Sequence, residues 1–372
     1  MTAGRIPSRN MLASLDDQRL ERSLMRIRIG VQLGYSRDFK RAAEQVVEME
    51  KVGADIVLVP EAYSYDAVSQ LGYLAAKTTT IEIGSGILPI YTRTPSLLAM
   101  TAAGMDYVSG GRFLLGLGAS GPQVVEGFHG VGFDSPLGRT REIIEICRQV
   151  WRRERLQHVG RHYQIPLPRD RGTGLGKPLQ IINHPVRERI PISIAALGPQ
   201  NVELAAEIAD GWQPVFFYPE KAKSVWGDAL GAGFAKRDAA LGGLDIIVGT
   251  PLAIGDDVED RVARAKPPLA LYIGGMGAKG RNFYHALATR YGFGEAADRI
   301  QELYLAGRKQ EAIAVVPDDL VRHVSLIGST GFVRERMAAF AEAGVTTLLV
   351  SPLTDNAAEY VDFIAQLKNL TR

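Results

Sequence analysis

Cysteine is almost absent from this sequence of 372 residues, which contains Cys147 and no other cysteine. A single cysteine excludes an internal disulfide framework and favours a reducing compartment such as the cytoplasm. Its neighbours Ile143, Ile144 and Ile146 follow helical spacing. We therefore expect Cys147 to be a buried and unreactive thiol.

Long hydrophobic runs are also missing. The sequence has no stretch of about 18 apolar residues, the length that a helix needs to cross a bilayer. Residues 1–25 lack the apolar segment of about 7–15 residues that secretory signals contain. We expect a cytoplasmic protein in which residues 1–25 form an irregular N-terminal arm and residues 26–372 form one domain.

An excess of charge of either sign is lacking as well. Lys and Arg together number 43, Asp and Glu number 41, and the formal net charge is +2. Nucleic acids and anionic membranes select basic surfaces, so neither is expected as the main partner. The composition, 46% hydrophobic and 23% charged, is typical of a globular protein with a full core. A small-molecule substrate is the partner that remains.

From residue 26 onward, short apolar runs alternate with segments of helical periodicity. The strand candidates are 27–33, 56–59, 81–88, 113–117, 192–196, 212–217, 246–254 and 346–350. Continuous apolar runs indicate strands buried on both faces, as in a parallel sheet covered by helices. This alternation, spread over most of the chain, predicts an α/β fold, the (β/α)8 TIM barrel.

Two regions interrupt the alternation. Residues 154–190 are rich in Gly and Pro and predict a long, hairpin-like excursion, and residues 267–325 begin with Pro267-Pro268 and continue with helical spacing. Long insertions in such barrels commonly carry binding residues on loops around the barrel mouth. We therefore expect both insertions to lie over the C-terminal face of the barrel.

The segment 116–121 reads GLGASG, which matches the glycine spacing of a dinucleotide-binding loop. That motif requires a helix whose N-terminus faces the pyrophosphate, yet here Pro122 follows and the unit is the fourth in the alternation. The glycines are better explained as the end of a barrel strand that a flat ligand can approach closely. The segment 84–89, GSGILP, is a second unusual strand end, typical of either a bulge or a plain turn.

Three other features of the sequence bear on catalysis, phosphate binding and metal binding. Glu61 follows the second strand, where a carboxylate is placed either for catalysis or as a solvated loop residue. The segment 197–201 joins a strand to a helix, and its backbone N–H groups suit a phosphate as well as ordinary capping. The six histidines are scattered, and the nearest pair, His158 and His162, has no ligand spacing, so no metal site is predicted.

Taken together, several segments resemble the luciferase-like monooxygenase superfamily, and most closely its actinobacterial oxidoreductases that use the deazaflavin coenzyme F420. The similar segments are 93–95 (RTP), 106–118 (DYVSGGRFLLGLG), 136–142 (PLGRTRE) and 209–212 (ADGW). The resemblance runs from about Arg26 to the C-terminus. It implies a TIM barrel that binds coenzyme F420, with FMN as the alternative cofactor, and it implies a homodimer.

The resemblance also assigns roles to residues. It implies a non-prolyl cis peptide bond at Gly86-Ile87, in a bulge that backs the cofactor ring. It places Glu61 at an acidic position beside that ring. The positions that it implies for cofactor binding are Gly86, Ile87 and Leu88 at the ring, Ala119 and Ser120 at the ribityl chain, and Ala196, Leu197, Gly198 and Pro199 at the tail and phosphate.

One position departs from the family pattern. Several deazaflavin dehydrogenases carry a histidine for proton transfer directly after the acidic residue, and here that position is Ala62. Glu61, Tyr63 or a residue of the insertions could replace it, or water could supply the proton in a reduction. The expected function is hydride transfer between the deazaflavin C5 and a small organic substrate. The alternatives are an FMN-dependent monooxygenase that uses oxygen, and a non-catalytic deazaflavin-binding barrel.

Overall fold

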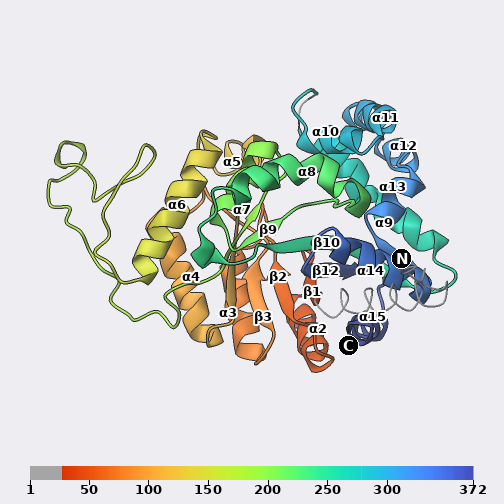
Figure 1. The fold of residues 1–372 in the computed structure, drawn as a ribbon, viewed down its shortest axis with the longest axis horizontal. Helices are drawn as coiled ribbons and strands as arrows, with labels where there is room; N and C mark the ends of the chain where they lie inside the picture. Colours follow the sequence, from red (N-terminus) through yellow and green to blue (C-terminus); the bar gives the residue numbers. More distant parts are fainter. Residues whose placement is uncertain (1–26, 278, 372) are drawn as a thin grey trace, which may run out of the picture.

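The computed structural model describes residues 27–277 and 279–371 (Figure 1). The N-terminal arm predicted for residues 1–25 lies outside the described residues. Among the helices that are described, none is long and apolar enough to cross a membrane.

A closed barrel of parallel strands forms the centre of the molecule and confirms the predicted fold class (Figure 1). Its strands are, in spatial order, β1 (Arg28–Gln32), β2 (Ile56–Val59), β3 (Glu82–Ser85), β5 (Phe113–Gly118), β8 (Ile192–Ala195), β9 (Gly211–Gln213), β10 (Asp245–Ile254) and β12 (Thr347–Pro352). Pairing of β9 with β10 and of β12 with β1 closes the ring. Each of the eight predicted strand regions overlaps one of these strands.

One further parallel strand was missed. β11 (Leu326–Gly328) pairs with the last three residues of β10, whereas the first two residues of β10 pair with β9. β10 is ten residues long and therefore reaches beyond the short β9 to a second neighbour. A three-residue strand directly after a helical insertion carries too little periodicity to be recognised in the sequence.

Two predicted strand boundaries were wrong. The strand predicted over 212–217 ends at Gln213, because Phe216 has a positive φ of 50° and Phe217 is buried in a stack against Trp226 of helix α8 (Pro219–Phe234). The strand predicted over 81–88 breaks after Ser85 and resumes as β4 (Leu88–Pro89). In both places apolar residues are buried without belonging to a continuous strand.

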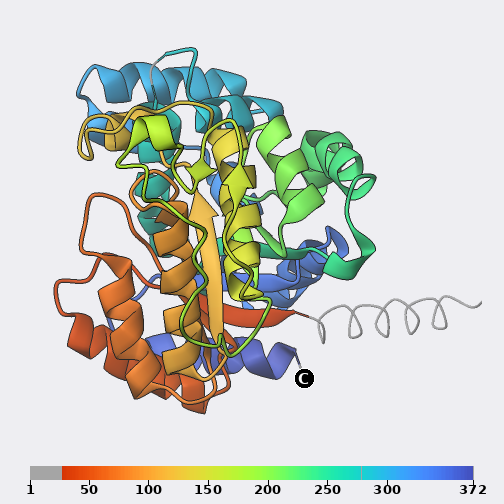
Figure 2. The ribbon, with the colours of Figure 1, turned by 90° about the vertical axis from the view of Figure 1, so that its left-hand side faces the viewer.

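Helices cover the outside of the barrel (Figures 1 and 2). Those following successive strands are α2 (Phe39–Lys51), α3 (Ala67–Lys77), α4 (Pro95–Ser109), α6 (Pro136–Trp151), α7 (Pro199–Ile208), α8, α14 (Thr330–Glu342) and α15 (Ala357–Leu370). Their ends follow the sequence signals: Thr94 caps the first turn of α4, and Gly110 ends the same helix with a φ of 67°.

The interior of the barrel is filled with side chains. A separate cluster of buried residues lines it, consisting of Ile56, Leu58, Leu114, Ile247 and Leu349. The larger core lies between the strands and the outer helices and includes Cys147. As predicted, the Cys147 side chain is fully buried, and burial raises the pKa of this thiol to about 12. The barrel is therefore a packed core, and ligands can approach only its ends.

The first insertion, 154–190, lies along the outer side of α6, as Figure 2 shows. It contains a short antiparallel hairpin of β6 (His158–Val159) and β7 (Gln164–Ile165). Tyr163 of this hairpin contacts Arg139 near the mouth of the barrel, and the segment returns to the opposite end, where Arg187 pairs with Asp106. The insertion thus reaches the rim of the C-terminal face but does not extend across it.

Glu142 of α6 fastens this hairpin. Its carboxylate accepts hydrogen bonds from the backbone N–H groups of Arg161, His162 and Tyr163, and it lies 3.2 Å from His158 Nε2. Burial acts to raise the pKa of Glu142, but these hydrogen bonds outweigh it and hold the pKa below its ordinary value. His158, which the sequence left without a partner, is thereby joined to a carboxylate 16 residues away.

The Glu142→Gln variant is expected to lose at least about tenfold of the hydrogen-exchange protection of the amides of residues 161–163, because charge-assisted bonds contribute about 1.5–3 kcal/mol each. A carboxylate whose folded pKa is lowered stabilises the fold above its unfolded pKa, and this contribution is lost as the pH falls through the folded pKa. Acidification of the unmodified protein should therefore release the same amides. Glu145→Gln, at an exposed position of the same helix, is the control; equal protection in both variants would contradict this role.

The second insertion forms a group of helices beyond the end of β10 (Figure 1). They are α9 (Glu259–Gly275), α10 (Phe283–Arg290), α11 (Gly294–Leu305), α12 (Lys309–Ala314) and α13 (Asp318–His323). The insertion begins before residue 267, since α9 continues through Pro267 and Pro268, whereas the proline pair had predicted a boundary there. It follows the C-terminal end of a barrel strand, and Phe283 of α10 approaches Gly198 in the loop after β8.

Candidate active site

The C-terminal ends of the barrel strands meet on one face, and the predicted site residues follow these ends. Glu61 and Tyr63 follow β2, Gly86 and Ile87 follow β3, Ser120 follows β5, and residues 196–199 follow β8. In TIM barrels this face carries the active site. The topology therefore brings together residues that lie up to 138 positions apart in the sequence.

The peptide bond between Gly86 and Ile87 is cis, at the position that the family resemblance implied. The bond lies between β3 and β4, where Gln32 Nε2 donates a hydrogen bond of 3.3 Å to the carbonyl oxygen of Gly86. A Cβ placed on Gly118 would lie 2.8 Å from Ile87 Cγ1, so the isoleucine packs closely against β5. Leu88, which the resemblance also assigned to the cofactor ring, is fully buried, so it has no accessible surface for a ligand.

Glu61 is held in a bidentate ion pair. Arg93 donates to both carboxylate oxygens, at 2.6 and 2.9 Å, and the backbone N–H of Ala67 donates to one of them at 2.9 Å. The Glu61 and Arg93 side chains are only 8% and 12% exposed. Arg93 also pairs with Asp66 at 2.6 Å. Burial acts to lower the pKa of Arg93, but its bonds to Glu61 and Asp66 raise it, so the guanidinium remains charged.

These contacts change the interpretation of Glu61. Both carboxylate oxygens accept hydrogen bonds from a permanently charged donor, which fixes the position of the carboxylate. Glu61 is therefore suited to fix the loop after β2 and the start of α3 more than to accept a proton. The sequence contained Arg93 as part of a family-like segment, but nothing in it indicated that Arg93 would meet Glu61.

The glycine-rich segment after β5 has a structural explanation. Gly116 lies inside β5, and a Cβ there would come within 1.9 Å of the Ser85 carbonyl oxygen on β3. Ser85 Oγ also bonds to both backbone groups of Gly116, at 2.8 and 2.9 Å. α5 (Pro122–Val125) follows, but it has only four residues. Gly116 thus serves contact between strands, whereas the sequence had indicated a strand end that a flat ligand can approach closely.

Ser120 adopts a left-handed backbone conformation, with a φ of 59°, and its side chain is exposed beside the half-buried Ala119. Non-glycine residues in this conformation are uncommon and often occur at binding sites. The two residues implied to contact the cofactor thus lie at an irregular, accessible strand end.

The loop after β8 presents backbone groups. Gly198 is the N-cap of α7, and no side chain caps this helix. A Cβ on Gly198 would have Phe283, at 3.7 Å, as its nearest neighbour, so the loop is not tightly covered. Ala196 is buried and its carbonyl oxygen accepts a 2.9 Å bond from Trp212 Nε1, whereas Leu197 and Pro199 are accessible. The uncapped N–H groups of α7 favour an anion.

Aromatic side chains surround these strand ends. The Tyr63 ring is 66% exposed and lies 6.2 Å from the ring of Phe128. Tyr272 of α9 lies 5.5 Å from Phe216 and 4.7 Å from Tyr284 of α10, measured between ring centroids. Of these aromatic residues, Tyr63 alone was predicted from the sequence to belong to the site. Residues of an insertion cannot be assigned to the mouth of the barrel until the fold is known.

Comparison with known proteins identifies the family that the sequence resembled, over nearly the whole chain. The family model described as "Luciferase-like monooxygenase" matches residues 23–347. The chain is 42% identical over 346 residues to a protein of Mycobacterium tuberculosis, "Putative coenzyme F420-dependent oxidoreductase Rv3520c", covering 92% of this chain and 99% of that protein.

Solved structures share the fold at low identity. The coenzyme F420-dependent tetrahydromethanopterin reductase from Methanopyrus kandleri has a TM-score of 0.75 and 22% identity, and the match covers 91% of this chain and 97% of that one. The oxygenating constituent of 3,6-diketocamphane monooxygenase from Pseudomonas putida, in complex with FMN, has a TM-score of 0.61 and 19% identity, with 93% and 97% covered. The fold is thus common to proteins that use either cofactor, and by its sequence and its barrel this chain belongs to the luciferase-like monooxygenase family.

Proposed function

We propose that the protein is a coenzyme F420-dependent oxidoreductase that transfers a hydride between the deazaflavin C5 and a small organic substrate. The observation that carries this proposal is the 42% identity, over nearly the full length of both chains, to a relative named for F420 dependence. The alternative, an FMN-dependent monooxygenase that uses oxygen, shares the same fold. The cofactor therefore decides between the two functions.

The residues at the mouth fit a deazaflavin. A flat ring would rest against Gly86 and Ile87, which are joined by the cis peptide bond and are only partly buried. The ribityl chain would pass Ser120, and the phosphate would meet the uncapped N–H groups at the start of α7. When bound, this group supplies the hydride chemistry, and the protein supplies position and exclusion of water.

Of the two residues predicted to be catalytic, Tyr63 is the one that we propose to act on the substrate, and Glu61 becomes a positioning residue. The Glu61–Arg93 pair fixes the loop that carries Tyr63, so its contribution is to orientation. Tyr63 is one of the exposed polar residues on that loop, and its hydroxyl is available to donate a proton to a substrate oxygen. Tyr63 follows Ala62, the position at which several family members carry their histidine. We propose that the tyrosine performs the proton transfer in its place.

A fluorescence titration of the purified protein with coenzyme F420, run in parallel with FMN, tests the cofactor. Binding at micromolar concentration or tighter for F420, with weak binding of FMN, is the expected result. The reverse preference would place the protein among the oxygen-using enzymes and would predict an oxygen requirement. Tight F420 binding without turnover of a broad substrate panel would favour a non-catalytic barrel.

Glu61→Gln is expected to reduce kcat about tenfold or more while leaving F420 binding and the fold intact. The amide keeps the size of the carboxylate but loses its charge, so Arg93 is left with Asp66 and the loop that carries Tyr63 loses its bidentate anchor. Steady-state kinetics, with a melting curve for each protein, measures the effect. Asp66→Asn is the matched control, because Asp66 contacts the same guanidinium from an exposed position. Unchanged turnover in Glu61→Gln would remove Glu61 from the mechanism.

A further inference from the structure

Six aromatic side chains lie around the mouth of the barrel and are called here the aromatic wall. They come from separate segments: the loops after β1, β2, α5 and β9, and helices α9 and α10. The members are Tyr35, Tyr63, Phe128, Phe216, Tyr272 and Tyr284. Aromatic rings gathered from distant segments around one opening are typical of a binding surface for an apolar ligand.

Tyr272 is the centre of the aromatic wall. Its ring packs edge-on against Phe216 and Tyr284, and it lies close enough to Tyr35 and Tyr63 to interact with both electrostatically. Tyr35, Tyr63 and Phe128 are large apolar side chains that nevertheless remain 62–66% exposed. The wall therefore has a packed base on the second insertion and an open surface on the loops after β1, β2 and α5.

The charges around the wall disfavour an anionic ligand. Burial, and then the nearby Tyr272, Tyr63 and Glu61, raise the pKa of Tyr35. Burial and then the nearby Tyr63 raise the pKa of Tyr272. Arg93, the cation that reaches Glu61, is occupied by two carboxylates. A phosphate or carboxylate beside Glu61 would therefore find the Arg93 guanidinium already paired.

From this arrangement we infer that the aromatic wall, centred on Tyr272, binds a flat, uncharged and largely apolar substrate. The inference rests on the proposed function, since it names the substrate class of the same site. The rings contribute stacking area, and the tyrosine hydroxyls contribute donors for a carbonyl oxygen. We therefore expect sugar phosphates and other anionic metabolites to bind poorly at this surface.

Calorimetric titration of the protein, with and without bound coenzyme F420, tests the inference with two probes. Benzylideneacetone is flat and uncharged, and phenyl phosphate carries a similar ring with a dianion. We expect benzylideneacetone to bind and phenyl phosphate not to bind. Tyr272→Ala should weaken benzylideneacetone binding up to about tenfold, because an aromatic pair contributes about 0.5–1.5 kcal/mol. Tyr272→Phe keeps the ring and should bind within about twofold of the unmodified protein.

Leu271→Ala, at the neighbouring exposed position of α9, is the matched control and should bind like the unmodified protein. Tyr63→Ala, on the exposed side of the wall, gives a second test if Tyr272→Ala fails to fold. Phenyl phosphate binding as tightly as the ketone, or unchanged ketone binding in both alanine variants, would overturn the inference. If the protein binds F420, the proposed function stands whether or not the two probes behave as expected. If Tyr272-dependent ketone binding is found without F420 binding, the proposed function alone is overturned.

Discussion

Gly116→Ala is expected to destabilise the protein by about 3 kcal/mol or more and to lower its melting temperature by about 4 °C or more. The added Cβ would come within 1.9 Å of the Ser85 carbonyl oxygen and 2.8 Å of Gln213 Nε2. A backbone oxygen in a closed barrel cannot move away without disturbing the pairing of β3 with β5. Thermal unfolding, with the yield of soluble protein, measures the effect.

Gly121→Ala is the control from the same glycine-rich segment. Gly121 has a φ of −125°, and a Cβ there would meet nothing within 4 Å, so stability should change by less than about 0.5 kcal/mol. A dinucleotide-binding loop would instead need both glycines for its ligand. Normal stability in Gly116→Ala would contradict the strand-contact explanation, and loss of cofactor binding in Gly121→Ala would revive the phosphate-loop interpretation.

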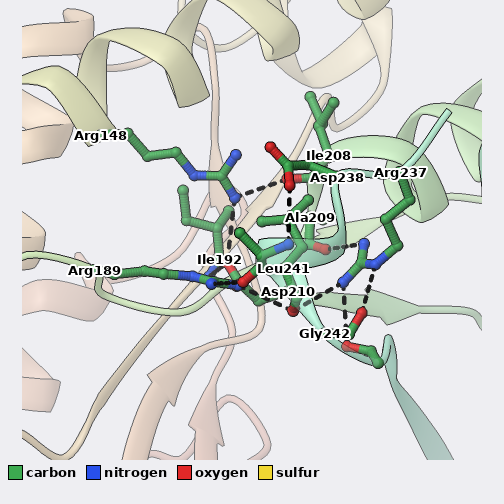
Figure 3. A network of polar contacts seen from close by, with 12 residues as sticks. Arg148, Arg189, Ile192, Ile208, Ala209, Asp210, Arg237, Asp238, Leu241 and Gly242 are labelled. Carbon is green, nitrogen blue, oxygen red and sulfur yellow. Dashed lines mark hydrogen bonds and ion pairs between the residues drawn. The ribbon is translucent and has the colours of Figure 1, made fainter.

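Asp210→Asn has the second largest expected effect, about 2–3 kcal/mol, because Asp210 neutralises a cluster of arginines at the N-terminal end of the barrel (Figure 3). Its carboxylate pairs with Arg189 and Arg148 and accepts a 3.0 Å bond from the backbone N–H of Ile192. Arg237 lies beside them and donates to the carbonyl oxygens of Ala206 and Ala209. The variant leaves three guanidinium groups near one another without this counter-charge. The loss of stability is smaller than for a fully buried network, because the Arg189 side chain is 43% exposed to solvent.

The electrostatics of this cluster support the expectation. Burial, and then the repulsion of neighbouring arginines, lower the pKa of Arg237, and Asp210 is the carboxylate that opposes this shift. Chemical denaturation at low and at high salt measures the loss, which salt should partly restore, because the network is partly open to solvent. Asp228→Asn, at an exposed position of α8, is the control. Equal stability of the two variants would show that the arginines need no counter-charge.

The fold could be predicted from the sequence because its signals are local. Most barrel strands lie in apolar runs followed by Gly, Pro or polar residues, and most outer helices have their own periodicity. The wrong predictions concern apolar residues that are packed in the core without belonging to a strand, such as Phe216 and Phe217. They also concern β11, which is too short to be recognised. The position of the cis peptide came from family resemblance, since two glycines at a strand end were compatible with a plain turn.

The candidate site was predicted only in part. The strand-end positions were recognisable because the carboxyl ends of parallel strands must share one face. The partners of those residues were not, because a pair such as Glu61 and Arg93 is separated by 32 positions and joined by no repeating pattern. The same holds for Glu142, whose carboxylate fastens a hairpin about 20 residues further along the chain.

The sequence by itself determined the alternation of strands and helices, the absence of disulfides and membrane-length apolar runs, and the glycines that allow β3 and β5 to approach. Only the tertiary structure decided that Glu61 is bound by Arg93 and that Tyr272 of an insertion faces Tyr35 and Tyr63. The physical reason is that secondary structure follows from neighbouring residues, whereas charge pairing and binding surfaces depend on contacts between segments that only the closed barrel brings together.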